Sequence, residues 1–312
     1  MADTTTQVEN ETARQAFIEE FRDIEIPVLP AAVSQLISEI NRDEPDIGRL
    51  EAIIASEPQI SAKILRTINS SNYALRAQVT TIRHAITMLG LNRVRSIGLS
   101  YAILHGVPEP EIRLFNHEAF WTDSLLRSQL ARAITRRTMP GQEDEAFTAM
   151  MLCDVSVPVL LTAWEEKYLP VFERWQGEVK ELAHLEREFV GWDHAQASAW
   201  ILHRWEFPEK LVNTAAAHNS EVAQLREQGL YDTIALPVMC ASLLPSSLKP
   251  NRDRMRNMIK VGSQELLLKR SRWPDIQIEV REAFGAICEE FELSGHLALS
   301  VLDVLEDVAN PD

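Results

Sequence analysis

Residues 50–73, LEAIIASEPQISAKILRTINSSNY, and residues 80–100, TTIRHAITMLGLNRVRSIGLS, decide the fold class of this chain. In both stretches apolar side chains recur every three or four residues, which is the period of an α-helix with one buried face. The two apolar faces consist of Ile60, Ile64, Leu65 and Ile68, and of Ile82, Ala85, Ile86 and Leu89. Gly90 follows the second helix, at a position that favours positive φ. Strand-like alternation persists nowhere in the sequence, so we expect an all-α protein.

The helical period continues toward the C-terminus, with two interruptions rich in proline. VPEPE at 107–111 marks a boundary between two helical lobes, and PSSLKPN at 245–251 is typical of a linker. We expect residues 146–164 to form one long helix that kinks at Pro158. Apolar residues at helical spacing also follow residue 251, and they need a surface to bury them, on this chain or on a partner.

The charge balance argues against nucleic acid as a partner. The 312 residues hold 31 Lys and Arg against 46 Asp and Glu, a net charge of −15, which opposes binding to a phosphate backbone. Arg127, Arg132, Arg136 and Arg137 share one helix, where their spacing predicts a solvated face. With 11 glycines and neither GxGxxG nor GxxxxGK[ST], the sequence lacks the usual phosphate-binding loops.

Cysteine usage and hydropathy predict a cytoplasmic protein. The cysteines Cys153, Cys240 and Cys288 form no CxxC pair and no even disulfide framework, which suits a reducing compartment. The first 15 residues are polar and acidic, unlike a secretory signal. The most apolar stretch, residues 234–245, is too short to cross a bilayer, so we expect no membrane insertion.

The two stretches quoted first resemble the N-terminal half of an HDOD domain. That family combines a proline-flanked entry, here IPVLP at 26–30, with an "I..DP.L..KLL...NSA.Y" and an "I..AI..LG" segment. The chain matches the two segments, apart from Glu57 in place of the usual Asp, at Ile54, Pro58, Ile60, Lys63, Leu65, Asn69, Ser70, Tyr73, Ile82, Ala85, Ile86, Leu89 and Gly90. Residues 119–133 and 191–219 resemble the helices of the second lobe.

The resemblance implies a domain organisation. Residues 1–21 form an N-terminal tail and residues 22–222 an HDOD domain, followed by a helical extension over 223–312. Within the domain, 22–108 is the N-terminal lobe and 112–222 resembles an HD-type lobe. HD-type enzymes are metal-dependent phosphohydrolases, in which His and Asp side chains hold divalent ions. HDOD members are regarded as bacterial signalling modules that have lost much of that site.

The resemblance also places the former metal site on particular residues. The positions of the HD ligand set fall on Asp123, Cys153, Asp154, His194, His218 and Asn219. The lysine that can meet a substrate phosphate in HD enzymes is replaced by Val157. Asn219 is a weaker ligand than imidazole, and the mixed set does not suit a two-metal centre. We therefore expect no cofactor, and a single divalent metal remains the alternative.

The ligand positions also have plainer interpretations. Cys153 lies in the apolar segment MMLCDV, where a free cysteine usually packs as a small hydrophobe. Asp154 then needs polar partners, and His194 or His218 could hydrogen-bond to it in a structural network.

Two functional hypotheses follow. The first is a non-catalytic HDOD signal-transduction protein that acts by contact with another signalling protein. The second is a metal-dependent phosphohydrolase or nucleotide-binding sensor with an altered ligand set. By sequence, the cations nearest to His194 and His218 are Arg187 and Arg204, together with any that the helix of Arg127 to Arg137 contributes.

Overall fold

The computed structural model describes residues 21, 24–29, 31–40, 42, 46–69 and 78–309. Every regular element in this part of the chain is a helix, which confirms the all-α class. The predicted tail, like Ser70 and Tyr73 of the family pattern, lies outside the described residues, apart from Phe21 at its end. Phe21 is fully buried and packs against the rings of Trp164, Trp192 and Trp200.

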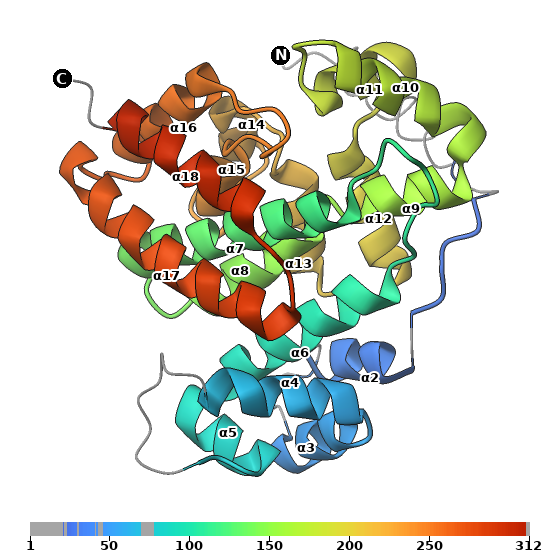
Figure 1. The fold of residues 1–312 in the computed structure, drawn as a ribbon, viewed down its shortest axis with the longest axis vertical. Helices are drawn as coiled ribbons and strands as arrows, with labels where there is room; N and C mark the ends of the chain where they lie inside the picture. The colour runs from blue at the N-terminus through green and yellow to red at the C-terminus, as the bar shows by residue number, and fades with distance from the viewer. Residues whose placement is uncertain are drawn as a thin grey trace.

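Five helices form the part of the molecule drawn lowest in Figure 1 and its link to the rest. They are α2 (Ala31–Ile40), α3 (Ile47–Ala55), α4 (Pro58–Asn69), α5 (Ile82–Leu89) and α6 (Leu91–Gly106). The apolar faces predicted from the sequence meet here, and Ile64 and Ile68 have no exposed surface. Gly90 separates α5 from α6 with φ +83° and ψ 157°, a conformation that is almost restricted to glycine.

The centre of the fold is a pair of adjacent helices, α7 (His117–Thr138) and α8 (Glu143–Leu152). The predicted single helix over 146–164 is wrong, because α8 ends at Leu152 and α9 (Ser156–Ala163) begins four residues later. Pro158 lies in the first turn of α9, where its missing N–H has no partner to lose. The break occurs at Cys153–Val155 and exposes the Asp154 side chain to a cavity.

Four further helices follow α9, and a second, smaller core lies beside the main one. They are α10 (Glu165–Gly177), α11 (Leu182–Phe189), α12 (His194–Arg204) and α13 (Glu209–Ala217). The small core gathers Phe21, Val157, Leu160, Leu161, Tyr168, Phe172 and Trp192, mostly from α9, α10 and their surroundings. In Figure 1, α9–α12 occupy the upper right, away from the C-terminal helices.

The C-terminal helices pack on their own chain. They are α14 (Val222–Glu227), α15 (Ala235–Ser242), α16 (Arg252–Gln264), the short 3₁₀ helix η2 (Arg270–Arg272), α17 (Trp273–Phe291) and α18 (His296–Ala309). The helix α17 lies against both α7 and α4, so one hydrophobic core runs from the N-terminal lobe to the C-terminus. The extension therefore finds within this chain the surface that its apolar residues require.

Burial in the fold affects two segments that the sequence alone describes differently: the arginines of α7 and the apolar segment Glu143–Ala163. The predicted solvated arginine face on α7 is wrong for Arg127 and Arg132, which are mostly buried and pair with Asp154 and Asp144, whereas Arg136 is exposed. A helix can bury guanidinium groups when carboxylates from neighbouring elements meet them. One segment, Glu143–Ala163, is long and apolar enough to cross a membrane, but 83% of its most apolar window is buried inside the fold.

Candidate functional site

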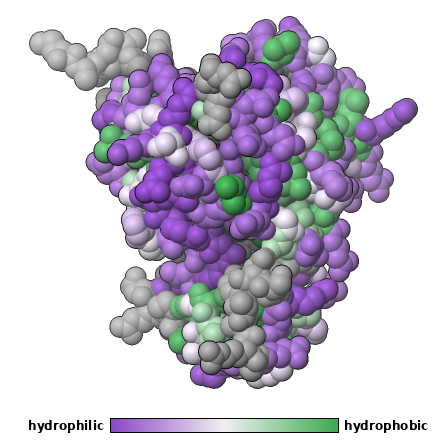
Figure 2. Space-filling model, turned by 60° about the vertical axis from the view of Figure 1, so that its left-hand side comes forward, coloured by the Kyte–Doolittle hydropathy of each residue, from purple (hydrophilic) through white to green (hydrophobic). Residues whose placement is uncertain are grey.

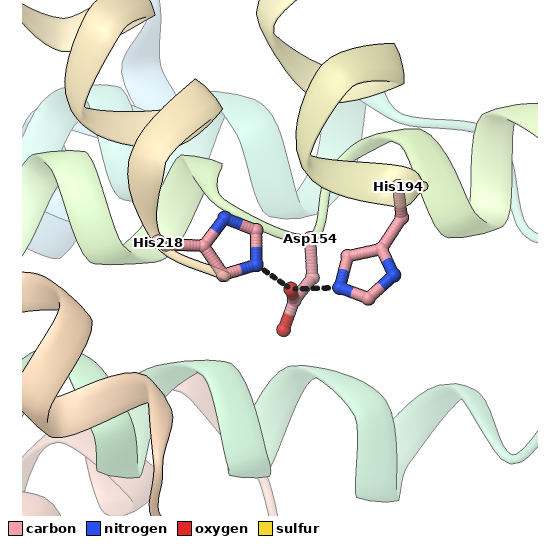
Figure 3. Close-up of side chains that lie close together, drawn as sticks. All are labelled: Asp154, His194 and His218. Carbon is pink, nitrogen blue, oxygen red and sulfur yellow. Dashed lines mark ion pairs between the residues drawn. The ribbon is translucent and has the colours of Figure 1, made fainter. Parts of the chain in front are cut away.

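Three side chains from different helices converge on one point in the second lobe. Asp154 lies between α8 and α9, His194 is the first residue of α12, and His218 directly follows α13. Figure 3 shows both imidazoles directed at one carboxylate oxygen, Oδ1 of Asp154. His194 Nε2 lies 3.5 Å from this oxygen and His218 Nε2 lies 3.3 Å from it. The convergence that the family resemblance implied for these three residues is present.

The start of α12 is fixed by a capping box, which places His194. The Asp193 carboxylate accepts hydrogen bonds from the backbone N–H groups of Ala195 and Gln196, and the Gln196 side chain accepts one from the Asp193 N–H. Arg187 pairs with the other carboxylate oxygen of Asp193. Because both reciprocal hydrogen bonds of the capping box form, the helix begins at His194, and the imidazole ring of His194 faces Asp154.

Hydrogen bonds at the Nδ1 atoms orient both imidazoles. His194 Nδ1 lies 2.6 Å from Oε2 of the fully buried Glu186, whose other oxygen accepts a hydrogen bond from the Tyr168 hydroxyl. His218 Nδ1 donates to the carbonyl oxygen of Ala215 at 2.7 Å. Both Nε2 atoms therefore face Asp154, and the buried Nε2 of His218 has no hydrogen-bond partner.

The charge of Asp154 is balanced by an arginine. Arg127 donates from Nη1 to Oδ2 of Asp154 at 2.9 Å and from Nε to the Leu244 carbonyl at 2.9 Å. Burial opposes ionisation of Asp154, but the nearby His218, Arg127 and His194 hold its pKa well below the usual range. Burial also opposes protonation of His194, yet the carboxylates of Glu186, Asp154 and Asp193 raise its pKa to about 9. In the metal-free protein the carboxylate and the His194 imidazolium therefore carry opposite charges at neutral pH.

Asp123 lines the same cavity but lies outside the Asp154–His194–His218 cluster. Its Oδ2 accepts hydrogen bonds from the Ser246 hydroxyl at 2.7 Å and the Ser247 N–H at 2.9 Å. Burial raises the pKa of this carboxyl, although Arg127 and the two serines act in the opposite direction. Its buried Oδ1 has no hydrogen-bond partner.

The remaining two predicted positions differ from each other. Cys153 is fully buried, lies near Ala149 O at 3.2 Å and does not line the cavity, so it packs as a small hydrophobe. Burial, with Asp154 beside it, raises the pKa of this thiol well above its ordinary value, which disfavours a thiolate ligand. Asn219 contacts the cluster, with Nδ2 2.9 Å from His194 Nε2.

A cavity of about 770 Å³ opens over the cluster. Phe115, Phe172 and Trp175 form an aromatic wall, and Val157 lines the cavity at the position where HD enzymes carry lysine. The segment 245–251, predicted as a linker, is part of this wall. Lys249 donates to the Glu178 carbonyl at 2.7 Å and lies over the Trp175 ring.

The donor set fits one metal ion and not two. Oxygen and imidazole ligands 3.3 and 3.5 Å apart suit a single divalent ion with bonds of about 2.1 Å, and the unpartnered His218 Nε2 is available to it. Asp154, His194 and His218 would hold that ion. Arg127 on the carboxylate and the proton on His194 compete with such an ion. Among the described residues, no other group of His, Cys, Asp and Glu side chains brings its ligand atoms together in this way, so a second ion has no comparable site there.

Sequence reasoning missed the residues that surround the ligand positions. Arg127 lies one turn after Asp123 on the same face of α7, and this spacing could have linked it to the site. Glu186 and the Arg254–Glu181 ion pair carry no such signal, because their positions depend on how α11 and α16 pack. Of the two cations expected near the histidines, Arg187 lines the cavity, whereas Arg204 lies over the Trp200 ring.

Comparisons with known proteins agree with this architecture. The HDOD domain family model matches residues 26–221. The chain spans less than half the length of the two curated relatives that it matches, 41% and 26% of them. Among solved structures, it resembles an HDOD domain protein of unknown function from Geobacter sulfurreducens, with TM-score 0.62, 17% identity and 98% of each chain covered.

Two further solved structures share the fold at low sequence identity. A candidate phosphohydrolase from Shewanella amazonensis SB2B is 19% identical, with TM-score 0.62, over 94% of this chain and 98% of its own. A candidate signal transduction protein from Marinobacter aquaeolei VT8 is 16% identical, with TM-score 0.63, over 96% of this chain and 66% of its own. At such identities the likeness shows the fold alone. With the family match over most of the chain, the protein belongs to the HDOD domain family.

Proposed function

We propose that this chain is a non-hydrolytic signal-transduction protein of the bacterial cytoplasm, which acts by binding another signalling protein. One observation supports this function above the others: two of the three candidate ligand side chains, Asp154 and His194, are paired with other side chains of this chain. Arg127 pairs with Asp154, and Glu186 pairs with Nδ1 of His194. These pairings compete with a metal-bound water of the kind that hydrolysis requires.

An apolar residue occupies the position at which the family resemblance implies a phosphate-binding lysine. Val157 stands at the cavity wall where the family resemblance predicts a lysine in hydrolytic enzymes. Among the other cations of the cavity, Arg187 pairs with Asp193 and Arg254 pairs with Glu181. A guanidinium already bound to a carboxylate gives less stabilisation to a developing phosphoryl charge.

A phosphohydrolase assay tests this proposal. The purified chain is incubated with bis(p-nitrophenyl) phosphate and added Mn²⁺, Fe²⁺ or Zn²⁺, beside the variant Asp154→Asn. Asp154→Asn is nearly isosteric and removes the central ligand charge. We expect equal, background rates for both proteins. A rate that rises with metal and falls at least about a hundredfold in Asp154→Asn would overturn the proposal.

The second function, a metal-dependent phosphohydrolase or nucleotide sensor, is favoured by one observation. The buried Nε2 of His218 lacks a hydrogen-bond partner although it faces a carboxylate, as expected of a ligand atom whose ion is absent. A single ion at Asp154, His194 and His218 would satisfy it. Metal titration of the chain against His218→Gln separates this function from the first, because only the second predicts saturable binding that the substitution removes.

A further inference from the structure

A basic groove lies on the C-terminal helices, and Arg252 at its edge also lines the cavity of the candidate site. It has a volume of about 560 Å³ and is bounded by α16 and the end of α18. Its described lining contains four cations and one carboxylate, and consists of Arg252, Arg256, Ile259, Lys260, Ser263, Arg270, Asp307 and Val308. We call it the α16 groove.

The charge of this region is opposite to that of the whole chain. Residues 249–272 hold Lys or Arg at eight positions against Asp253 and Glu265, in a protein of net charge −15. Figure 2 brings the side of the C-terminal helices forward, and this face is mainly hydrophilic. A local reversal of charge on a polar surface is typical of a docking site for a complementary partner.

The spacing of the cations matches a helix rather than a compact anion. Arg252, Arg256 and Lys260 follow one another every four residues on α16, which places them on one face about 6 Å apart. Arg270 donates to the carbonyls of Val308 and Ala309 and so fixes the far wall of the groove. Arg252 and Arg256 hold exposed ion pairs with Asp307 and Asp253, and such surface pairs are weak enough for the carboxylates of a partner to replace. A row of this kind suits acidic side chains at the same helical spacing on a partner.

An exposed leucine lies beside the basic row in the chain. Leu267 has φ +55° and a side chain that is 82% exposed, whereas Leu266 and Leu268 are buried. A left-handed conformation is unfavourable for a leucine, so this turn, between the groove residues Ser263 and Arg270, holds an apolar side chain in solvent at an energetic cost. Such a side chain suits an apolar pocket on a partner protein.

We propose that the α16 groove, with Leu267, is the docking surface for an acidic helix of a partner protein. This inference rests on the proposed function, because a chain without its own chemistry needs a surface that passes on its signal. A nucleic acid is less favoured, because no aromatic side chain is among the described lining residues and the net charge repels a polyanion. A membrane is less favoured, because Leu267 is the one large apolar side chain exposed within residues 249–272, and a membrane-binding surface needs several.

A designed peptide tests the groove directly. The probe is a fluorescein-labelled, 18-residue helical peptide with Glu at i, i+4 and i+8 and Leu beside them, and its control carries Gln for Glu. Fluorescence anisotropy with the full chain should show saturable binding of the Glu peptide alone. Raising NaCl from about 50 to 500 mM should weaken it about tenfold or more, since the contacts are charged and exposed.

Charge reversal within and outside the groove provides the matched comparison. Arg256→Glu with Lys260→Glu should lower the affinity at least about tenfold. Arg83→Glu with Arg113→Glu changes the net charge equally at exposed positions elsewhere and should stay within about twofold. Equal losses in both pairs would overturn the proposal, as would no binding at about 1 mM peptide. Tighter binding to an 18-mer of deoxythymidine or to phosphatidylserine vesicles than to the peptide would also overturn it.

Leu267→Gly separates a binding role from a structural one. Glycine accepts positive φ, so the melting temperature should be unchanged or higher, while the peptide affinity falls several-fold. Unchanged affinity would remove Leu267 from the docking surface. Failure of peptide binding, with no phosphohydrolase activity, refutes this groove and leaves the proposed function standing; hydrolysis of phosphate esters refutes the function whatever the peptide does.

Discussion

Arg127 of α7 reaches Asp154, at the junction of α8 and α9, with Nη1 2.9 Å from Oδ2. The same guanidinium donates to the Leu244 carbonyl, so it ties α7 to the α8–α9 junction and to the loop after α15. The carboxylate at the centre of the candidate metal site is therefore neutralised by a side chain of the same chain. The arginine joins three elements of the fold around this carboxylate.

Removal of this arginine should destabilise the protein. Arg127→Met leaves Asp154 without its nearest cation, and the side chains of both residues are only 14% exposed. Breaking such a pair from one side should lower the free energy of unfolding by about 2–4 kcal/mol in urea denaturation. The double variant Arg127→Met with Asp154→Asn should lose less than the sum of the two single variants. Strict additivity would contradict a direct coupling.

The pH dependence of stability should report the His194–Glu186 pair. The folded pKa of about 9 for His194 exceeds the unfolded value near 6.5, so protonation stabilises the fold fully below pH 6.5. This contribution decreases as the pH rises toward 9. In EDTA, the free energy of unfolding should fall by about 2 kcal/mol between pH 6.5 and 8.5 from this group.

Glu186→Gln provides the control for this decrease. The amide keeps the shape of Glu186 but removes the charge that holds the proton on His194. Chemical denaturation of both proteins across the same pH range, followed by subtraction, cancels the contributions of the three cysteines. A difference that does not change between pH 6.5 and 8.5 would show that Glu186 does not raise the pKa of His194.

Gly90 should tolerate no side chain because of its backbone, and not because of its neighbours. A Cβ at Gly90 meets nothing within 4 Å, but φ is +83°. Gly90→Ala and Gly90→Val should therefore each cost about 1–3 kcal/mol. Gly177→Ala is the matched control, since Gly177 also has open space and lacks positive φ. Equal thermal stability of Gly90→Ala and the unaltered chain would contradict this account.

Restoring imidazoles at the altered positions should restore metal binding. Asn219→His, alone and with Asp123→His, replaces the amide on His194 and the carboxyl held by Ser246 with the ligands that the family resemblance implies. We expect bound Mn, Fe or Zn to rise from traces to about one equivalent or more. A folded double variant, by circular dichroism, that still purifies without metal would show that more than these ligands has been lost.

The sequence predicted the helical class because the apolar period is local information. Ile60 to Ile68 and Ile82 to Leu89 form buried helix faces as the spacing indicates. The break before Pro158 was not predictable in the same way. The segment 146–164 is apolar throughout, and tertiary packing decides that the helix stops at Leu152 and presents Asp154.

The candidate site was predictable in part for the same reason. The family pattern identified Asp154, His194 and His218, which converge, and Asp123 and Asn219, which line the same cavity. The family pattern could not identify the side chains that bind these residues. Arg127 looked like a surface cation, and Ser246 like a linker residue, because their partners come from elements more than 25 residues away in the chain.

The metal content of the purified chain tests the central claim most directly. The protein is expressed with added Mn, Fe and Zn, purified without chelator and measured by elemental analysis. We predict less than about a tenth of an equivalent of each metal, because Arg127 and the proton on His194 already occupy the site. One or two equivalents, lost in His194→Ala or His218→Ala, would contradict a self-neutralised site and restore the phosphohydrolase as the leading function.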